Sequence, residues 1–339
     1  MVRETEGIDD HDYGYCEGGG GVDRYGFADL NYDATLAVTP ETRQRVLKTA
    51  EKLAYKPRRR KRVATQTTVA LIQWRSEQEE LNDLYYLQIQ YAIEARAASI
   101  GYHVQNLHLE QLNAESVANV QGIIALGKYD AGEVAEIKAL GLPIVFVDQN
   151  MLAFDCDSVT GDYAGPIAQI IDHFQKVGID DIGFLGGLET SRSGREQFQD
   201  VRTATFDRVT KAAGIDHAEF RLIGEFTPDS GYRLMRQAIE KLGEQLPHAF
   251  IIANDTMAVG ALRALNEANI SVPQRVSVIS FNDVAVAKFT TPPLSTVHAA
   301  TDQMGQTAVE LLQARLNDAK RVPRQVNFKS ELIMRASSL

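Results

Sequence analysis

The sequence predicts an α/β protein whose main part consists of doubly wound parallel sheets. Short runs rich in Val and Ile alternate with helical patterns from residue 66 onward, which is typical of buried parallel strands covered by helices. The pattern divides near residues 155–162 into two halves of similar build. The 339 residues are 44% hydrophobic and 24% charged, so the chain can fill a sizeable core and is not mainly disordered.

The formal net charge is −10, so the surface as a whole does not attract nucleic acids or anionic membranes. Any nucleic-acid site must therefore be a local basic patch. No apolar run approaches the length of about 18 residues that a membrane span requires, so we expect no membrane partner. The N-terminal segment lacks the apolar stretch of a secretory signal, and two cysteines, Cys16 and Cys156, cannot build a disulfide framework. We therefore expect a cytoplasmic protein.

The N-terminal segment is atypical. Residues 1–33 contain nine acidic side chains against two basic ones, with four consecutive glycines at 18–21. Apolar residues there follow neither helical nor strand periodicity. We expect this segment to be disordered in isolation.

Residues 34–62 contain one predicted helix and a basic linker. Thr39 suits an N-cap, Pro40 suits the first helical position, and Lys56-Pro57 ends the helix. Its single apolar stripe needs a partner surface. Residues 40–62 hold ten basic side chains against two acidic ones, which indicates either a solvated linker or contacts with DNA phosphates. The candidate DNA contacts are Arg58, Arg59, Arg60, Lys61 and Arg62.

The elements of the main part alternate regularly. Strands are predicted at 68–73, 102–107, 122–126, 143–147, 181–185, 249–253 and 276–281. Helices are predicted near 84–99, 131–139, 163–177, 197–213, 230–243, 255–268 and 301–317. Because ligand sites in open α/β sheets lie at the carboxyl ends of strands, the two halves should enclose a cleft there.

Polar side chains near these strand ends form a set suited to binding the hydroxyl groups of a sugar. Asp148 and Asn254 each follow a predicted strand, and Arg202 lies early in a helix. Carboxylates accept hydrogen bonds from hydroxyls, amides accept and donate, and a guanidinium bridges two hydroxyls. Such residues also cap helices, and we interpret Asp255 and Asp283 as caps. Aromatic side chains that could cover the faces of a sugar ring are Trp74, Tyr85, Tyr86 and Phe226.

No catalytic or metal-binding constellation is present. The glycines at 183, 186 and 187 lack the G-x-G-x-x-G spacing of a dinucleotide site and are better explained by a turn leaving a strand. The sequence also contains no Walker A motif, no G-x-S-x-G elbow and no histidine pair with metal-ligand spacing. We therefore expect neither an enzyme nor a bound cofactor or metal.

Several stretches resemble the LacI/GalR family of transcriptional regulators. The segment from Thr39-Pro-Glu-Thr-Arg to Lys-Pro57 resembles the third helix of the family's DNA-binding headpiece. The segment Ala253-Asn-Asp-Thr-Met-Ala-Val-Gly resembles the strand–helix junction of its second lobe. Val278-Ile-Ser-Phe-Asn-Asp283 and Pro292-Pro-Leu-Ser-Thr-Val297 resemble its crossover region. The resemblance covers about residues 34–339.

The resemblance implies a dimeric repressor of carbohydrate utilisation with a two-lobed, periplasmic-binding-protein-like sensor at residues 63–339. Lobe 1 would comprise about 66–160 plus 292–320, and lobe 2 about 161–291 plus 321–336. A sugar effector would close the lobes, shift the dimer interface and weaken operator DNA binding. Residues 73–86 and 231–235 look most like the branch that responds to galactose, galactosides and related oligosaccharides.

The same resemblance implies specific ligand contacts. Asp148, Arg202, Asn254 and Asn282 match family ligand contacts by position, and Phe226 matches an aromatic wall. Many members have Asp where this chain has Asn282. This difference keeps a hydrogen-bonding group but leaves the identity of the ligand open.

The N-terminus departs from the family pattern. The usual hinge helix with its Ala-Arg-x-Leu core is replaced by Pro57-Arg-Arg-Arg-Lys-Arg-Val63, and residues 1–30 contain no helix-turn-helix. Residues 22–29 permit codons whose shifted frame reads Val-Ser-Ile-Ala-Thr-Val-Ser-Arg-Ile, and residues 14–21 permit Asp-Ile-Ala-Lys-Glu-Ala-Gly. We hypothesise that one base was lost near the Leu30 codon, which would impair specific DNA binding; the alternative is an unrelated N-terminal extension.

Two other functions compete with a repressor. A transport-type sugar-binding protein would share the sensor fold, but the missing signal peptide and the basic helix count against it. A sugar-modifying enzyme would need a catalytic constellation that the sequence lacks.

Overall fold

The computed structural model describes residue 48 and residues 67–75 and 84–339. The chain divides into two units, residues 1–66 and 67–339, and the description below concerns the second. The expectations for residues 1–33, the 39–57 helix, the DNA contacts at 58–62 and the frameshift lie outside the described residues.

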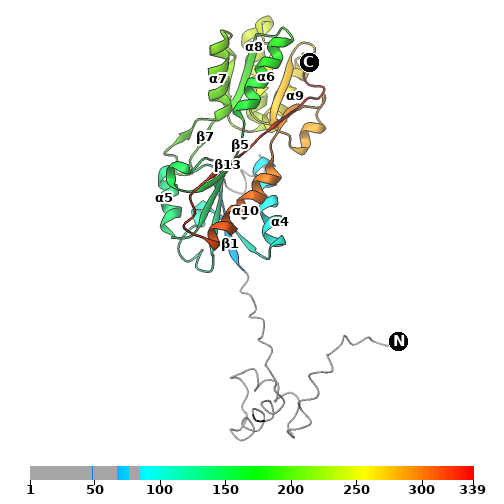
Figure 1. Ribbon diagram of the computed structural model, residues 1–339. Helices are drawn as coiled ribbons and strands as arrows, with labels where there is room; N and C mark the ends of the chain where they lie inside the picture. Colours follow the sequence, from blue (N-terminus) through cyan, green and yellow to red (C-terminus); the bar gives the residue numbers. More distant parts are fainter. Residues whose placement is uncertain (1–47, 49–66, 76–83) are drawn as a thin grey trace, which may run out of the picture. The chain divides into compact units, whose positions relative to one another are not determined.

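The first lobe is built on a six-stranded sheet in which every pair of neighbouring strands is parallel (Figure 1). The strand order is β13-β5-β4-β3-β1-β2. The strands are β1 (Thr68–Gln73), β2 (His103–His108), β3 (Gly122–Leu126), β4 (Ile144–Val147), β5 (Asp157–Gly161) and β13 (Gln325–Phe328). Its helices are α4 (Leu84–Ser99), α5 (Ala131–Ala139) and α10 (Thr301–Asn317). Gly305 lets α10 approach α4 closely, because a Cβ there would lie 2.8 Å from the backbone oxygen of Ile89.

The second lobe repeats this plan with the strand order β14-β12-β11-β10-β6-β9. Only the pair β12–β14 is antiparallel in this sheet. The strands are β6 (Ile182–Gly187), β9 (Arg221–Gly224), β10 (Ala249–Ile252), β11 (Ser277–Asn282), β12 (Ser295–His298) and β14 (Glu331–Ile333). Its helices are α6 (Ala164–Lys176), α7 (Val201–Ala213), α8 (Pro228–Leu242) and α9 (Asp255–Glu267).

Smaller elements complete the described part of the chain. A two-stranded antiparallel hairpin is formed by β7 (Glu189–Thr190) and β8 (Gln197–Phe198). Short 3-10 helices are η2 (Leu109–Gln111), η3 (Leu152–Phe154), η4 (Ala218–Phe220), η5 (Gly243–Gln245) and η6 (Ala285–Lys288).

The core of each lobe lies along its central strands. Every residue of β3 and of β11 is buried, and the largest fully buried side chains include Phe146, Phe184 and Phe250. Strands that are covered by helices on both faces must be apolar almost throughout. This requirement explains why the apolar runs of the sequence predicted the central strands to within two residues at either end.

Five strands of the two large sheets were not predicted from the sequence: β5, β9, β12, β13 and β14. β9, β13 and β14 lie at sheet edges and contain no buried residue, whereas β5 and β12 lie next to an edge strand. All five are short and mix polar with apolar side chains, so they lack the continuous apolar signal of a central strand.

Two boundaries of the expected lobes are wrong. The chain crosses between the sheets after β5, after β12 and after β13. β12 therefore belongs to the second lobe, where it pairs with β11, and β13 belongs to the first lobe, where it pairs with β5. Long-range strand pairing decides this exchange, and local sequence does not encode it. The placement of α10 in the first lobe agrees with the expectation.

Asp255 joins three elements of the second lobe. Its Oδ1 accepts hydrogen bonds from the hydroxyls of Ser280 and Thr296, and its Oδ2 accepts one from the Val284 amide at 2.8 Å. Asp255 is not the helix cap that the sequence predicted, because Asn254 caps α9 and Asp255 begins the helix. Burial raises the pKa of Asp255 to about 6.

The raised pKa makes stability fall with rising pH. The unfolded chain releases this proton near pH 4, whereas the folded protein holds it to about pH 6. Between these values the folded state binds more protons, so raising the pH favours unfolding. We expect the free energy of unfolding, measured relative to Asp255→Asn, to fall by about 2 kcal/mol from pH 4 to pH 7. Urea denaturation of both proteins across this range checks the result, and parallel pH profiles would contradict it.

Candidate ligand-binding cleft

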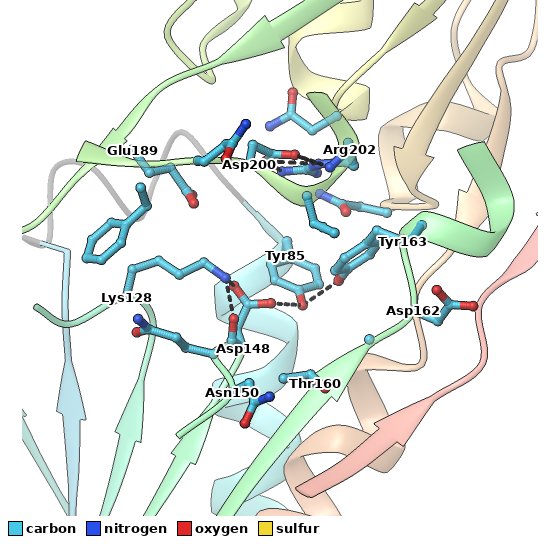
Figure 2. Close-up of a pocket in the computed structure, with 18 of the residues that line it drawn as sticks. Tyr85, Lys128, Asp148, Asn150, Thr160, Asp162, Tyr163, Glu189, Asp200 and Arg202 are labelled. Atoms are coloured by element: carbon cyan, nitrogen blue, oxygen red, sulfur yellow. Dashed lines mark hydrogen bonds and ion pairs between the residues drawn. The ribbon is translucent and has the colours of Figure 1, made fainter. Parts of the chain in front are cut away.

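A cavity of about 430 Å³ lies between the carboxyl ends of the two sheets (Figure 2). Its volume falls within the range of small-molecule sites, roughly 300–1,000 Å³. Both lobes and the crossover strands contribute to its lining. The predicted site residues that line it are Asp148, Arg202, Asn254, Asn282, Phe226, Tyr85 and Tyr86.

Asp148 organises the first-lobe side of this cavity. It follows β4 with φ +78°, a left-handed backbone that few residues other than glycine adopt. Its carboxylate accepts hydrogen bonds from the hydroxyls of Tyr85 and Tyr86, both at 2.9 Å. It also forms an ion pair with the Lys128 ammonium group at 2.8 Å. The Tyr163 hydroxyl donates in turn to that of Tyr85 at 2.6 Å. Asp148 therefore lines the cavity, but protein groups already occupy much of the hydrogen-bonding capacity of its carboxylate.

Lys128 and Glu189 approach the cavity from opposite lobes. Burial opposes the charge of Lys128, yet the carboxylates of Asp148 and Glu189 raise its pKa. Burial raises the pKa of Glu189, which also pairs with Arg75 at 3.4 Å. Sequence analysis missed both residues, because neither follows a predicted strand directly nor belongs to a motif.

Arg202 is held firmly at the start of α7. Asp200 caps this helix by accepting the Arg202 amide at 2.7 Å, and it also accepts the Arg202 Nε at 2.9 Å and its Nη2. The Nη1 donates to the Ala253 carbonyl at 2.5 Å. Burial opposes both charges, but each partner stabilises the other, so the pKa of Asp200 is lowered and that of Arg202 is raised. The guanidinium is thus fixed and charged beside the cavity.

Phe226 forms an aromatic wall beneath this guanidinium. The Arg202 Cζ lies 5.1 Å from the Phe226 ring centroid and 5.4 Å from that of Tyr163. A Cβ at Gly187 would lie 2.5 Å from the Phe226 ring. The glycine at 187 therefore makes room for the wall. The expected turn leaving the strand is wrong, because Gly183, Gly186 and Gly187 all lie within β6.

Two asparagines close the second-lobe side. The Asn254 Oδ1 caps α9 by accepting the Met257 amide at 2.8 Å. Its Nδ2 is buried at the cavity and has no hydrogen-bond partner among the described residues. Asn282 ends β11 with φ +103° and is 5% exposed. The expected cap Asp283 instead pairs with Arg335 at 2.6 Å, so that interpretation is wrong.

Trp74 does not line this cavity. Its ring packs over Gly127, where a Cβ would lie 2.5 Å from the Trp74 Cβ, and meets Tyr86 edge-on at 6.1 Å between centroids. It borders a neighbouring cavity that shares Glu189 and Phe226 with the first. A bend at residues 74–75 follows β1 directly, and the sequence did not indicate it.

The described residues contain no group of three or more His, Cys, Asp or Glu side chains arranged to hold a metal ion. No helix in the described ranges is long and apolar enough to cross a membrane.

Two sheets joined by three crossovers around a polar, aromatic-walled cavity define a periplasmic-binding-protein-like ligand sensor. The family model described as "Periplasmic binding protein-like domain" matches residues 171–338. The chain is 85% identical over 310 residues to the HTH-type transcriptional regulator GalR of Lacticaseibacillus casei, covering 91% of this chain and 94% of that protein. The chain belongs to the LacI/GalR family of transcriptional regulators. The predicted class is confirmed, and the regulator is favoured over an enzyme or a transport protein.

Solved structures show the same fold. The transcriptional regulator CelR–cellobiose complex superposes with a TM-score of 0.71 at 23% identity, covering 95% of this chain and 98% of that chain. The lac repressor dimer bound to operator and an anti-inducer superposes with a TM-score of 0.70 at 24% identity, covering 96% and 98%.

Proposed function

We propose that this chain is a sugar-responsive repressor whose effector, galactose or a galactoside, binds in the cavity between the lobes. The observation that carries the proposal is Asn254, which lines the cavity and whose buried Nδ2 has no hydrogen-bond partner among the described residues. An unpaired buried donor costs about 1–3 kcal/mol, so a ligand acceptor that pairs with it is favoured. Phe226 supplies an apolar face, and CelR holds cellobiose in the same fold.

The charges of the cavity favour an uncharged sugar over a phosphorylated one. Its described lining includes five carboxylates against two cations, Lys128 and Arg202. Both cations are already paired with carboxylates. A phosphate would therefore meet a surplus of negative charge, whereas sugar hydroxyls can donate to these carboxylates.

A thermal-shift panel tests the proposal. We expect galactose or a galactoside such as lactose to raise the melting temperature by about 5 °C at 100 times its dissociation constant. Galactose 6-phosphate and glucose should give smaller shifts. The absence of a shift with galactose and with every galactoside would overturn the assignment of the effector.

Variants at Asn254 separate helix capping from ligand contact. Asn254→Ser keeps a side-chain oxygen that caps α9 but removes the Nδ2 donor. We expect its unfolding free energy to change by less than about 1 kcal/mol while galactose affinity falls about tenfold. Asn266→Ser, at a position near the end of the same helix, is the matched control. Equal affinity of Asn254→Ser and wild type, measured by calorimetry, would remove Asn254 from the contacts.

We propose that the protein acts as a homodimer. The resemblance to the family implies a dimer surface on the sensor lobes, and the proposal is supported by the lac repressor of similar fold, which was solved as a dimer. The fragment 63–339 should therefore sediment as a dimer at micromolar concentration. Sedimentation as a monomer would count against this proposal.

Operator DNA is the proposed second partner. The basic residues at 58–62 would supply phosphate contacts, which give affinity without sequence information. Residues 1–30 lack a recognition helix by sequence, so we propose that operator-specific binding is impaired in this chain.

A further inference from the structure

The hairpin β7–β8 belongs to the second lobe but reaches the first. Its strands contribute Glu189 and Phe198 to the cavity lining, and its tip, residues 191–196, lies beyond them. In Figure 1 the hairpin runs from below α7 toward α5. The same short element thus lines the ligand cavity and bridges the lobes.

The tip is an ordered turn that presents Ser193. The Ser191 amide donates to the Glu196 carbonyl at 2.8 Å, and the Gly194 amide donates to the Ser191 carbonyl at 2.9 Å. Gly194 has φ +71°, a conformation that glycine adopts without strain. The Ser193 hydroxyl also accepts the Arg195 amide at 3.2 Å.

The surface that receives this tip is the N-terminal turn of α5. Asp130 and Glu133 form a capping box, in which Asp130 Oδ1 accepts the Glu133 amide at 2.8 Å and Glu133 Oε2 accepts the Asp130 amide at 2.9 Å. Each carboxylate has a second oxygen, and Ser193 pairs with both. Its amide donates to Glu133 Oε1 at 2.8 Å and its hydroxyl donates to Asp130 Oδ2.

These contacts join the lobes in buried surroundings. Asp130 is 4% exposed and Glu133 is 3% exposed. Burial opposes ionisation of Asp130, but the Ser193 hydroxyl and the Glu133 amide lower its pKa. The Asp130 carboxylate is thus a charged acceptor, and hydrogen bonds to charged groups are the stronger kind. Arg195 lies over Gly132 in the same turn, where a Cβ would be 2.5 Å from its guanidinium.

We propose that Ser193, Asp130 and Glu133 form an interlobe clasp that holds the hairpin over the cavity and positions Glu189 and Phe198 for the effector. Breaking the clasp frees one wall of the cavity, so a bound sugar escapes faster. The clasp itself is a property of the fold, and only its effect on sugar affinity rests on the proposed function.

Hydrogen exchange of the ligand-free, full-length protein tests the clasp directly. Glu133→Gln changes the first lobe only and leaves every bond within the tip intact. In the variant an NH2 group replaces one of the two carboxylate oxygens, so the position that faces either the Ser193 amide or the Asp130 amide no longer accepts a hydrogen bond. We expect the amides of residues 191–196 to exchange about tenfold faster in this variant, as in Ser193→Ala, whereas Ser193→Thr retains the hydroxyl and should resemble wild type.

Glu136→Gln is the matched control, because Glu136 is an exposed acid on the same helix. Exchange in this variant should equal that of wild type. The clasp is overturned if the amides of 191–196 in wild type exchange as fast as an unstructured peptide, or if Glu133→Gln leaves their exchange unchanged.

Calorimetry with galactose tests the consequence for affinity. We expect Glu133→Gln and Ser193→Ala to bind galactose about tenfold more weakly than Glu136→Gln does. Equal affinities in all variants would overturn the effect on the ligand. If galactose fails to bind even the wild type, the proposed effector is wrong, and the exchange experiment still decides whether the clasp exists.

Discussion

Arg202→Ala should abolish the rise in melting temperature that an effector sugar produces. The guanidinium is fixed by Asp200 and the Ala253 carbonyl and lies over the Phe226 ring at the cavity. It is therefore preorganised to donate to sugar hydroxyls with its remaining N–H groups. Losing two charge-assisted hydrogen bonds should weaken binding at least about 100-fold. Titration calorimetry with galactose measures this loss.

The structure adds a stability cost that the sequence did not indicate. Asp200 and Arg202 are 5% and 11% exposed, so removing the guanidinium leaves a buried carboxylate unpaired. We expect Arg202→Ala to destabilise the fold by about 3–5 kcal/mol. The double variant Asp200→Asn/Arg202→Gln removes both charges and should recover part of this stability without recovering sugar binding.

Arg221→Ala provides the matched control. Arg221 pairs with Asp207, and both side chains are about two-fifths exposed, at 42% and 40%. Exposed pairs contribute about 0–1 kcal/mol, so this variant should keep both its stability and its sugar affinity. Unchanged galactose affinity in Arg202→Ala would remove Arg202 from the site.

Restoring one base near the Leu30 codon should convert weak, unselective DNA binding into operator recognition. The unrepaired chain contains the basic residues at 58–62, so it should bind any DNA duplex with an affinity that depends steeply on salt concentration. Its nine acidic side chains in residues 1–33 should weaken this binding further. The repaired protein should prefer a palindromic site, selected from random duplexes, by about 1,000-fold or more over unrelated DNA. Fluorescence anisotropy at several salt concentrations measures both proteins.

Two further results decide this prediction. Replacing the basic residues at 58–62 with glutamine should flatten the salt dependence of both proteins while leaving the preference of the repaired protein for its site. Resequencing the gene is the cheapest check. Stop codons in the shifted frame, or a shifted frame without a helix-turn-helix, would rule the frameshift out.

Much of the fold was predictable because its signals are local. The buried strands β1, β3, β4 and β10 consist largely of continuous apolar runs, and the helices between them carry their own periodicity. Helix ends were close to the predicted positions, as in α10, which spans Thr301–Asn317. Edge strands such as β9 lack this signal and were missed.

The candidate site was predicted in part, from polar residues at strand ends, from Arg202 early in a helix, and from aromatic side chains such as Phe226. Asp148, Asn254 and Asn282 occupy strand-end positions and line the cavity. Lys128, Glu189 and Asp200 line it as well, but loops and a hairpin bring them there. No motif and no predicted strand end marks these three residues in the sequence, so they were not predicted as site residues.

Two α/β halves with polar groups at the strand ends could be predicted from the sequence, because consecutive residues encode where a strand is buried and where it ends. Three features depend on the tertiary structure. β12 lies in the second lobe and β13 in the first, Asn254 and not Asp255 caps α9, and Ser193 contacts α5. Each of these depends on residues distant in the chain that compete for the same hydrogen bonds, and only the folded arrangement settles that competition.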